Sequence, residues 1–275
     1  MVKLLSIFDN EQETSAEKII IAQSKDKAVF VSVPHSGHFV LSQFKENFSF
    51  SKSMPLDTDL YTDEIFLNKE SSTITTLLCP HQLNMNRVFE AEHLEDKPIH
   101  LRGDALHTNS LIGDKILLQE YAPEEKAVLK IYYEEYHTKL QTFLEEGKKK
   151  HKRILLLDCH SYGSRGLSGT PDEGQERADI NLGTLEGKSC DKDILLFLKN
   201  FFIQHGLSCS IDFPYKGGYI TQKFANPSSG VNVIQIEVKK GLYMDERTFQ
   251  KKEKELQKLH ELFVELLKEL SSNPL

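Results

Sequence analysis

The chain has 275 residues, of which 39% are hydrophobic and 27% are charged, a composition typical of globular proteins. The sequence contains no apolar run long enough for a membrane-spanning helix, which requires about 18 to 20 residues. The formal net charge of −7 argues against a general nucleic-acid-binding protein, because such proteins need a basic face to neutralise phosphates. We therefore expect a protein that binds neither nucleic acid nor membranes.

The N-terminus and the cysteines indicate the compartment. Residues 1–9 lack the long apolar core and the cleavage site of a secretory signal. The cysteines, at positions 79, 159, 190 and 209, show no paired spacing. Reduced thiols in a cytoplasmic protein are therefore the simpler interpretation. The oligomeric state stays open.

Strand-like and helix-like segments alternate along the chain, and no repeat or linker divides it. This alternation predicts a single α/β domain over residues 1–275, with a mostly parallel or mixed central sheet and helices on both faces. Two polar segments, 88–115 and 161–190, are expected to form irregular loops. Strands are expected near 28–34, 73–79, 154–159, 208–212 and 232–238, and helices near 59–69, 123–148, 191–205 and 245–271.

Chemically useful side chains follow three of these strands. His35 and His160 each come just after a short apolar run, and a third run, 232–236, ends at Glu237. Sheets of this class place their chemistry at the carboxyl ends of the strands. Two histidines and a carboxylate are the ligand types of a mononuclear zinc hydrolase. The strand ends therefore predict a metal site.

The neighbours of the two histidines carry weaker signals. Asp158 and His160 are two residues apart, so they share a strand face, and Asp158 could accept a hydrogen bond that orients the imidazole. A buried aspartate that caps a neighbouring helix is the alternative. His38 lies three residues after His35, but this spacing has no fixed geometry in a loop. The segment 34–37 also fits an ordinary turn.

The segment 57–64 has the acidic residues of a helix entry. Asp59 and Asp63 are four residues apart and therefore lie on one face of that helix. Capping accounts for one acid. The other is left for a metal ion or for a substrate-binding arginine, and the pattern does not choose between them.

Two features could hold a substrate. Arg87 is by default a surface residue, but beside a zinc site its planar guanidinium would suit a substrate carboxylate. The segment 216–221 has neither helical nor strand periodicity, and it is either a surface turn or a ligand-binding loop. Its backbone donors and polar groups that could face a ligand are those of Lys216, Gly217, Gly218, Tyr219 and Thr221.

Taken in order, these segments resemble the N-formylglutamate amidohydrolase family, whose fold is similar to that of zinc carboxypeptidases and other phosphorylase/hydrolase-like proteins. The resemblance spans roughly residues 33 to 246, and the ordered set is specific although no single motif decides it. The matching segments are 34–37, 57–63, 86–87, 132–137, 157–161, 178–183, 216–221, 230–237 and 243–246.

The resemblance implies roles for individual residues. One zinc ion per chain would be held by His35, His160 and a carboxylate, for which Asp59 is the first choice and Asp63 the second. Glu237 matches the glutamate that activates water, and Arg87 matches an arginine that holds the substrate carboxylate. Asp158 and His137 are expected to contact the residues that bind the metal and the substrate, rather than the metal or the substrate itself.

The expected function is zinc-dependent hydrolysis of an N-formyl or other N-acyl amino acid such as N-formylglutamate, as in amino-acid degradation. One alternative is a carboxypeptidase-like or peptidoglycan-directed hydrolase with the same metal ligands and an open cleft. Another is a non-catalytic binding protein, which would have no need of His35, His160 and Glu237. The chain departs from the family in having Asn84 where Asp is common, Glu135 where Pro is common, and an insertion-like segment at 165–170.

Overall fold

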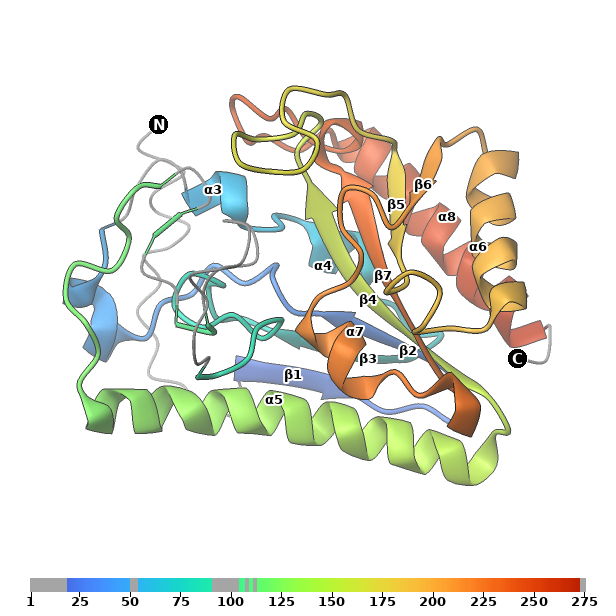
Figure 1. The fold of residues 1–275 in the computed structure, drawn as a ribbon, viewed down its shortest axis with the longest axis horizontal. Helices are drawn as coiled ribbons and strands as arrows, with labels where there is room; N and C mark the ends of the chain where they lie inside the picture. Colours follow the sequence, from blue (N-terminus) through green and yellow to red (C-terminus); the bar gives the residue numbers. More distant parts are fainter. Residues whose placement is uncertain (1–18, 50–53, 91–103, 107–108, 111–112, 273–275) are drawn as a thin grey trace.

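The computed structural model describes residues 19–49, 54–90, 104–106, 109–110 and 113–272. Within them, seven strands form one sheet in the order β1-β3-β2-β4-β7-β5-β6 (Figure 1). The strands are β1 Ile20–Gln23, β2 Val29–Val33, β3 Ser72–Thr76, β4 Ile154–Tyr162, β5 Ile180–Gly183, β6 Cys209–Ile211 and β7 Val231–Lys239.

The centre of the sheet is parallel. β3, β2, β4 and β7 run in one direction, whereas β1 is antiparallel to β3 and β5 is antiparallel to β7. β6 pairs with β5 in parallel. β4 and β7 pair over nine residues each, and every residue of β4 is buried, as expected of a strand covered on both faces. The prediction of a mixed α/β sheet is confirmed.

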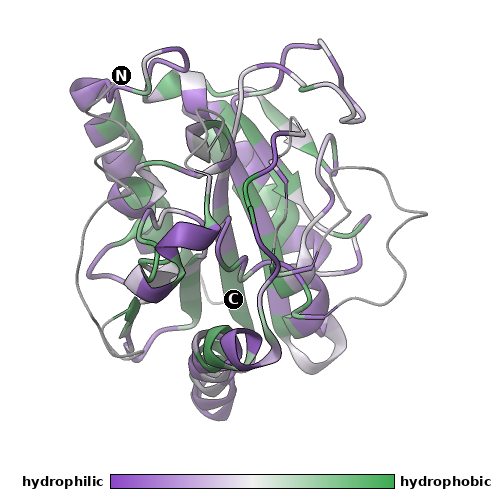
Figure 2. Ribbon diagram, turned by 90° about the vertical axis from the view of Figure 1, so that its left-hand side faces the viewer, coloured by the Kyte–Doolittle hydropathy of each residue, from purple (hydrophilic) through white to green (hydrophobic). Residues whose placement is uncertain are grey.

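Helices cover both faces of the sheet (Figure 1). The side chains of α5 pack in one apolar core with Phe30 and Leu156, and those of α4, α6 and α8 pack in a second core with Val31 and Leu157. The strands contribute most of the hydrophobic segments in Figure 2, and many loops around them are hydrophilic. The helices are α3 Met54–Asp57, α4 Thr62–Phe66, α5 Pro123–Lys150, α6 Lys192–Gln204, α7 Tyr219–Phe224 and α8 Glu253–Ser272, with 3-10 turns at Ser42–Asn47, Pro227–Ser229 and Lys240–Leu242.

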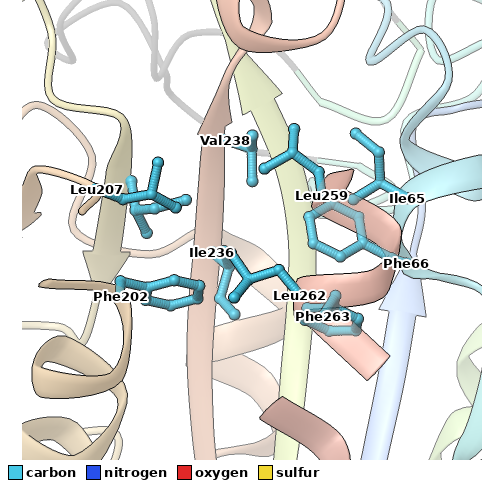
Figure 3. A pocket seen from close by; sticks show the side chains of 10 residues that line it. Ile65, Phe66, Phe202, Leu207, Ile236, Val238, Leu259, Leu262 and Phe263 are labelled. Carbon is cyan, nitrogen blue, oxygen red and sulfur yellow. The ribbon is translucent and has the colours of Figure 1, made fainter. Parts of the chain in front are cut away.

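Alternation along β7 separates the core from the chemistry. Ile236 and Val238 point toward α6 and α8, where they line a small apolar cavity with Phe202 and other core residues (Figure 3). Because successive side chains of a strand point to opposite faces, Gln235 and Glu237 lie on the other face of the sheet. The polar residues of β7 are thus kept apart from this apolar layer.

Several elements differ from the prediction. β1 and α7 were not predicted, and β5 lies inside the segment 161–190 that was expected to be a loop. These elements are four to six residues long and lack a periodic apolar pattern, so they depend on their partners in the sheet and on packing. α8 begins at Glu253, eight residues later than the predicted start, and α4 is limited to Thr62–Phe66. Residues 91–103, 107–108 and 111–112 of the predicted irregular segment 88–115, and residues 1–9, lie outside the described residues.

In the part of the chain that the structure describes, no helix combines the length and the apolar character needed to cross a membrane.

Candidate active site

His35, Asp59 and His160 come together at the carboxyl end of the central strands. One ligand atom from each lies within 4.8 Å of the other two. Asp59 Oδ2 is 3.5 Å from His35 Nδ1 and 3.0 Å from His160 Nδ1. In a tetrahedral zinc site with bonds of about 2.0–2.2 Å, neighbouring ligand atoms lie about 3.3 Å apart. The donor types and their separations therefore fit one zinc ion.

The chain around Asp59 fixes its carboxylate. The Asp59 backbone N–H donates to the carbonyl of His35 at 3.1 Å, which ties the two ligand segments together. The Thr62 hydroxyl donates to the Asp59 carbonyl, and the Ser161 hydroxyl donates to Asp59 Oδ1 at 3.0 Å. Only Oδ2 therefore faces both histidines.

Asn84 determines which nitrogen of His35 carries the proton. The backbone N–H of Asn86 donates to Asn84 Oδ1 at 2.8 Å, so the atom at this position is the oxygen. The same oxygen lies 2.7 Å from His35 Nε2, which must then be the donor. A neutral His35 therefore has its proton on Nε2 and a lone pair on Nδ1, the atom that faces Asp59 and His160.

Asp158 orients His160 in the same way. His160 Nε2 lies 3.1 Å from Asp158 Oδ2, and the Ser32 hydroxyl donates to Asp158 Oδ1 at 2.9 Å. Asn86 Nδ2 donates to Asp158 Oδ2 at 3.2 Å, and its own oxygen accepts the Ile220 N–H. Asp158 is fully buried. Asp158 Oδ2 thus lies at the Nε2 side of the imidazole, opposite Nδ1, the atom that faces Asp59.

Burial and neighbouring charges shift the pKa values of the three ligand candidates. Burial alone would raise the pKa of Asp59, but hydrogen bonds from His160 and His35 outweigh it and lower this pKa. Burial also opposes the charged form of His160, yet the Asp158 and Asp59 carboxylates raise its pKa well above the ordinary value. The pKa of His35 is lowered, chiefly by burial. Without a metal, a protonated His160 thus pairs with two carboxylates.

Glu237 lies beside this cluster on the neighbouring strand. It is the register partner of His160 in the parallel pairing of β4 with β7, so the two side chains share a face of the sheet. Glu237 is only 5% exposed, and burial raises the pKa of its carboxyl to about 7. Within the described residues, Oε2 is buried and accepts no hydrogen bond. A buried carboxyl with such a pKa and one uncommitted oxygen suits proton transfer near neutral pH.

Lys240 holds the segment that carries Asp59. It follows β7 directly, is buried, and donates to the carbonyls of Leu56 at 2.6 Å and Thr58 at 2.8 Å. Burial lowers the pKa of its ammonium group. The end of β7 therefore positions both Glu237 and, through Lys240, the Asp59 segment.

Arg87 lies next to Asn86 and is half-buried. Its Nη1 donates to the Asn86 carbonyl at 3.0 Å, and the Tyr133 hydroxyl anchors the Arg87 carbonyl at 2.7 Å. Burial lowers the pKa of the guanidinium, whereas Tyr215 and Glu237 act in the opposite sense. The guanidinium and the Glu237 carboxylate therefore influence each other electrostatically.

The segment 216–221 borders the site through its backbone. Gly218 N donates to the side chain of Gln235 at 2.7 Å, and a Cβ at Gly218 would lie 2.5 Å from Asn86 Nδ2, which explains the glycine. Lys216 is exposed and pairs with Glu186 at 2.6 Å, while Gly217 has a left-handed φ of 120°. Tyr219 begins α7. Thr221 is buried, and its hydroxyl makes no hydrogen bond within the described residues.

The N-formylglutamate amidohydrolase family model matches residues 27–244, which include each of these residues. The chain belongs to the N-formylglutamate amidohydrolase family. Family membership makes it a hydrolase of an amide C–N bond. It is 24% identical over 240 residues to the N-formylglutamate deformylase of Pseudomonas putida, covering 84% of this chain and 86% of that protein. It is 26% identical over 229 residues to the N-formylglutamate deformylase of Pseudomonas aeruginosa, covering 80% and 83%.

A solved structure shares the fold. The crystal structure of N-formylglutamate amidohydrolase from Ralstonia eutropha JMP134 superimposes with a TM-score of 0.75 at 18% identity and covers 91% of this chain and 97% of its own. The expectation of an enzyme of this family, rather than a non-catalytic binding protein, is confirmed.

Other residues considered from the sequence lie around this site. Asp63 is half-buried on α4, where its charge favours the protonated form of His38. It is not part of the cluster formed by the three ligand candidates. His137 is buried among aromatic rings, with Tyr133 at 4.3 Å and Phe224 stacked at 6.0 Å. Burial and Lys223 lower the pKa of His137 to about 3, so its ring is neutral. His137 therefore packs against Tyr133, whose hydroxyl donates to the Arg87 carbonyl.

Three positioning residues were missed from the sequence alone. Gln235 is a polar residue in a buried strand, two positions before Glu237, and this spacing was an available signal. Asn84 was noted only as a departure from the family. Lys240 had no signal, because a lysine after a strand is normally exposed.

Proposed function

We propose that the protein is a zinc-dependent deformylase that hydrolyses N-formylglutamate or a closely related N-acyl amino acid to the free amino acid and the acyl acid. One zinc ion per chain would be held by His35, Asp59 and His160. The observation that carries the proposal is that His160, one member of this ligand cluster, is the register partner of Glu237 on the neighbouring strand. The two curated deformylases support the substrate class.

Zinc at this position would act as a Lewis acid on the amide carbonyl and would lower the pKa of a water molecule. Neighbouring residues of the chain orient the three ligand side chains. Asn84 accepts from Nε2 of His35, and Asp158 Oδ2 lies 3.1 Å from Nε2 of His160, so each imidazole can present Nδ1 to the ion. Ser161 occupies one oxygen of Asp59, which leaves the other for the ion.

Glu237 would move the proton. Its uncommitted Oε2 takes a proton from the attacking water as the oxygen adds to the formyl carbon, and returns it to the amide nitrogen as the C–N bond breaks. The products are formate and an amino acid. General acid–base transfer of this kind contributes about 10²–10⁴-fold to rates.

Arg87 would hold a carboxylate of the substrate. Its guanidinium is electrostatically coupled to Glu237, and Tyr133 anchors its backbone carbonyl, which supports a role for this cation beside the site. The segment 216–221, with Gly217 and Gly218, would form the adjoining wall. Lys216 would contribute only after leaving Glu186, to which it is bound in this conformation.

The proposal is tested with the zinc-loaded enzyme and a substrate panel. N-formyl and N-acetyl derivatives of glutamate, glutamine and leucine are compared with dipeptides and a peptidoglycan stem peptide. We expect the highest kcat/KM for N-formylglutamate. Preferential cleavage of the peptides would instead indicate a carboxypeptidase-like hydrolase.

A further inference from the structure

Gln235 bridges Glu237 and the segment 216–221. It lies on β7 two residues before Glu237, on the same face, and is buried. The Gly218 backbone N–H donates to Gln235 Oε1 at 2.7 Å. Because a backbone N–H only donates, this contact fixes which end of the amide is the oxygen. The other end, Nε2, then donates to Glu237 Oε1 at 2.8 Å.

This bridge makes the two oxygens of Glu237 different. Oε1 is held by an amide that can only donate to it, whereas Oε2 is buried without a hydrogen bond inside the described part of the chain. A carboxylate rotates readily about its terminal torsion. The bond from Gln235 stops that rotation and leaves Oε2 as the oxygen available to a proton.

The same bridge ties down the segment 216–221. The N–H groups of Gly218 and Ile220 donate to two side-chain oxygens, those of Gln235 and Asn86. Asn86 Nδ2 also lies 3.4 Å from Gln235 Oε1. A displacement of the segment would therefore remove the anchor that orients the Gln235 amide, and with it the donor to Glu237.

We propose that Gln235 is a positioning residue that aligns the Glu237 carboxylate with the 216–221 segment, so that the base is oriented when the wall of the substrate site is in place. The inference rests on the proposed role of Glu237 as the proton carrier. If Gln235 only stabilised the fold, its substitution would change neither kcat nor the hydrogen exchange of the Gly218 amide selectively.

Two variants separate the two bonds. Gln235→Met removes both, whereas Gln235→Glu keeps an oxygen for Gly218 and replaces the amide donor to Glu237 with a carboxyl that donates only when it is protonated. The kcat of Gln235→Glu is therefore measured at alkaline pH, where both carboxyls are ionised. Gln82→Met is the matched control, since Gln82 is also fully buried and its Oε1 accepts a backbone N–H, that of Leu41 at 3.0 Å. For each protein we would measure zinc content, kcat, KM and hydrogen exchange of the Gly218 amide.

We expect kcat to fall about 10- to 100-fold in both Gln235 variants, the loss typical of one hydrogen bond to a charged group, with zinc content and KM nearly unchanged. The Gly218 amide should exchange faster in Gln235→Met and stay protected in Gln235→Glu. Gln82→Met should change neither quantity, even if it lowers stability.

A kcat within a few-fold of wild type in Gln235→Met, or in Gln235→Glu at alkaline pH, or unchanged Gly218 exchange in Gln235→Met, would overturn the inference. If Gln235→Met does not fold, the nearly isosteric Gln235→Glu still decides it through kcat at alkaline pH, where the introduced carboxyl is ionised and cannot donate. A wild-type enzyme that binds zinc but releases no formate would contradict the proposed function instead. The exchange of the Gly218 amide would then decide by itself whether Gln235 holds the segment.

Discussion

His160 and Glu237 are register partners on adjacent parallel strands, β4 and β7. One side chain is a candidate metal ligand and the other is the candidate proton carrier, so a single strand pairing sets their separation. The same pairing places Asp158 opposite Gln235, and each of these residues orients the functional group two positions later. The separation of these two groups is thus set by the most buried part of the sheet, whereas His35 and Asp59 come from the segments that follow β2 and precede α4.

Glu237→Gln should separate catalysis from binding. The amide keeps the shape of the side chain but cannot accept and return a proton, so kcat should fall by about 10²–10⁴-fold while KM and zinc content stay nearly unchanged. Steady-state kinetics with metal analysis would check this. Loss of zinc in this variant would make Glu237 a ligand, and near-normal kcat would remove it from the mechanism.

The two acids near α4 should behave differently. Asp59→Asn should lose zinc, because Asp59 Oδ2 is the oxygen that faces both histidines. Asp63→Asn should bind zinc normally, since Asp63 stands outside the cluster. Zinc stoichiometry after dialysis against a weak chelator gives the answer, and the reverse pattern would transfer the ligand role to Asp63.

The stability of the metal-free protein should depend on pH through Glu237. Its pKa is about 7 in the folded state against an ordinary value of 4.5. Below pH 4.5 the carboxyl is protonated in both states, but between pH 4.5 and 7 only the unfolded chain releases the proton. Stability should therefore fall as the pH rises through this window, by at most about 3 kcal/mol, and stay lower above it.

Urea unfolding of metal-free protein at pH 5 and pH 8 tests this expectation. His160 also loses a favourable proton at high pH, so the comparison is made with Glu237→Gln, in which the contribution of Glu237 is absent. The drop between the two pH values should be smaller in the variant. An equal drop in both proteins would show that the carboxyl titrates normally.

Arg87→Lys should weaken substrate binding. A lysine keeps the charge but loses the planar pair of donors, so KM for N-formylglutamate should rise about 10- to 100-fold with a smaller change in kcat. Arg153→Lys is the control, because Arg153 precedes β4 and lies at the opposite end of that strand from His160. An unchanged KM in Arg87→Lys would place the substrate carboxylate elsewhere.

Lys240→Met should loosen the Asp59 segment. The variant leaves two buried carbonyls without their donor, which should lower the free energy of unfolding by about 2 kcal/mol and weaken zinc binding. Lys239→Met is the control, since Lys239 pairs with Asp179 outside the site. Chelator competition and urea unfolding measure the two effects, and equal zinc affinity in both variants would contradict the role of Lys240.

The sequence was most informative where long apolar strands end in polar residues. His35 follows β2, and His160 and Glu237 lie near the carboxyl ends of β4 and β7. Their convergence follows from the common direction of these three strands. The short elements β5 and α7 could not be predicted, because their formation depends on neighbours far away in the chain. The role of Lys240 could not be predicted for the same reason, since only the fold shows which carbonyls it contacts.

The choice between Asp59 and Asp63 illustrates this limit. Helical periodicity placed both acids on one face, but Tyr61 adopts a left-handed φ of 68° at the start of α4, so Asp59 precedes the helix. The turn directs Asp59 toward the histidines. Cytoplasmic location and the single-domain assignment stay predictions.

The most direct test of the central claim is a zinc titration of metal-free protein with formate release from N-formylglutamate as the readout. We predict that activity is absent without metal, rises in proportion to added zinc and reaches its plateau at one zinc ion per chain. His35→Ala and His160→Ala should stay inactive at the same zinc concentrations. Full formate release by the metal-free protein, or by either histidine variant, would contradict the account.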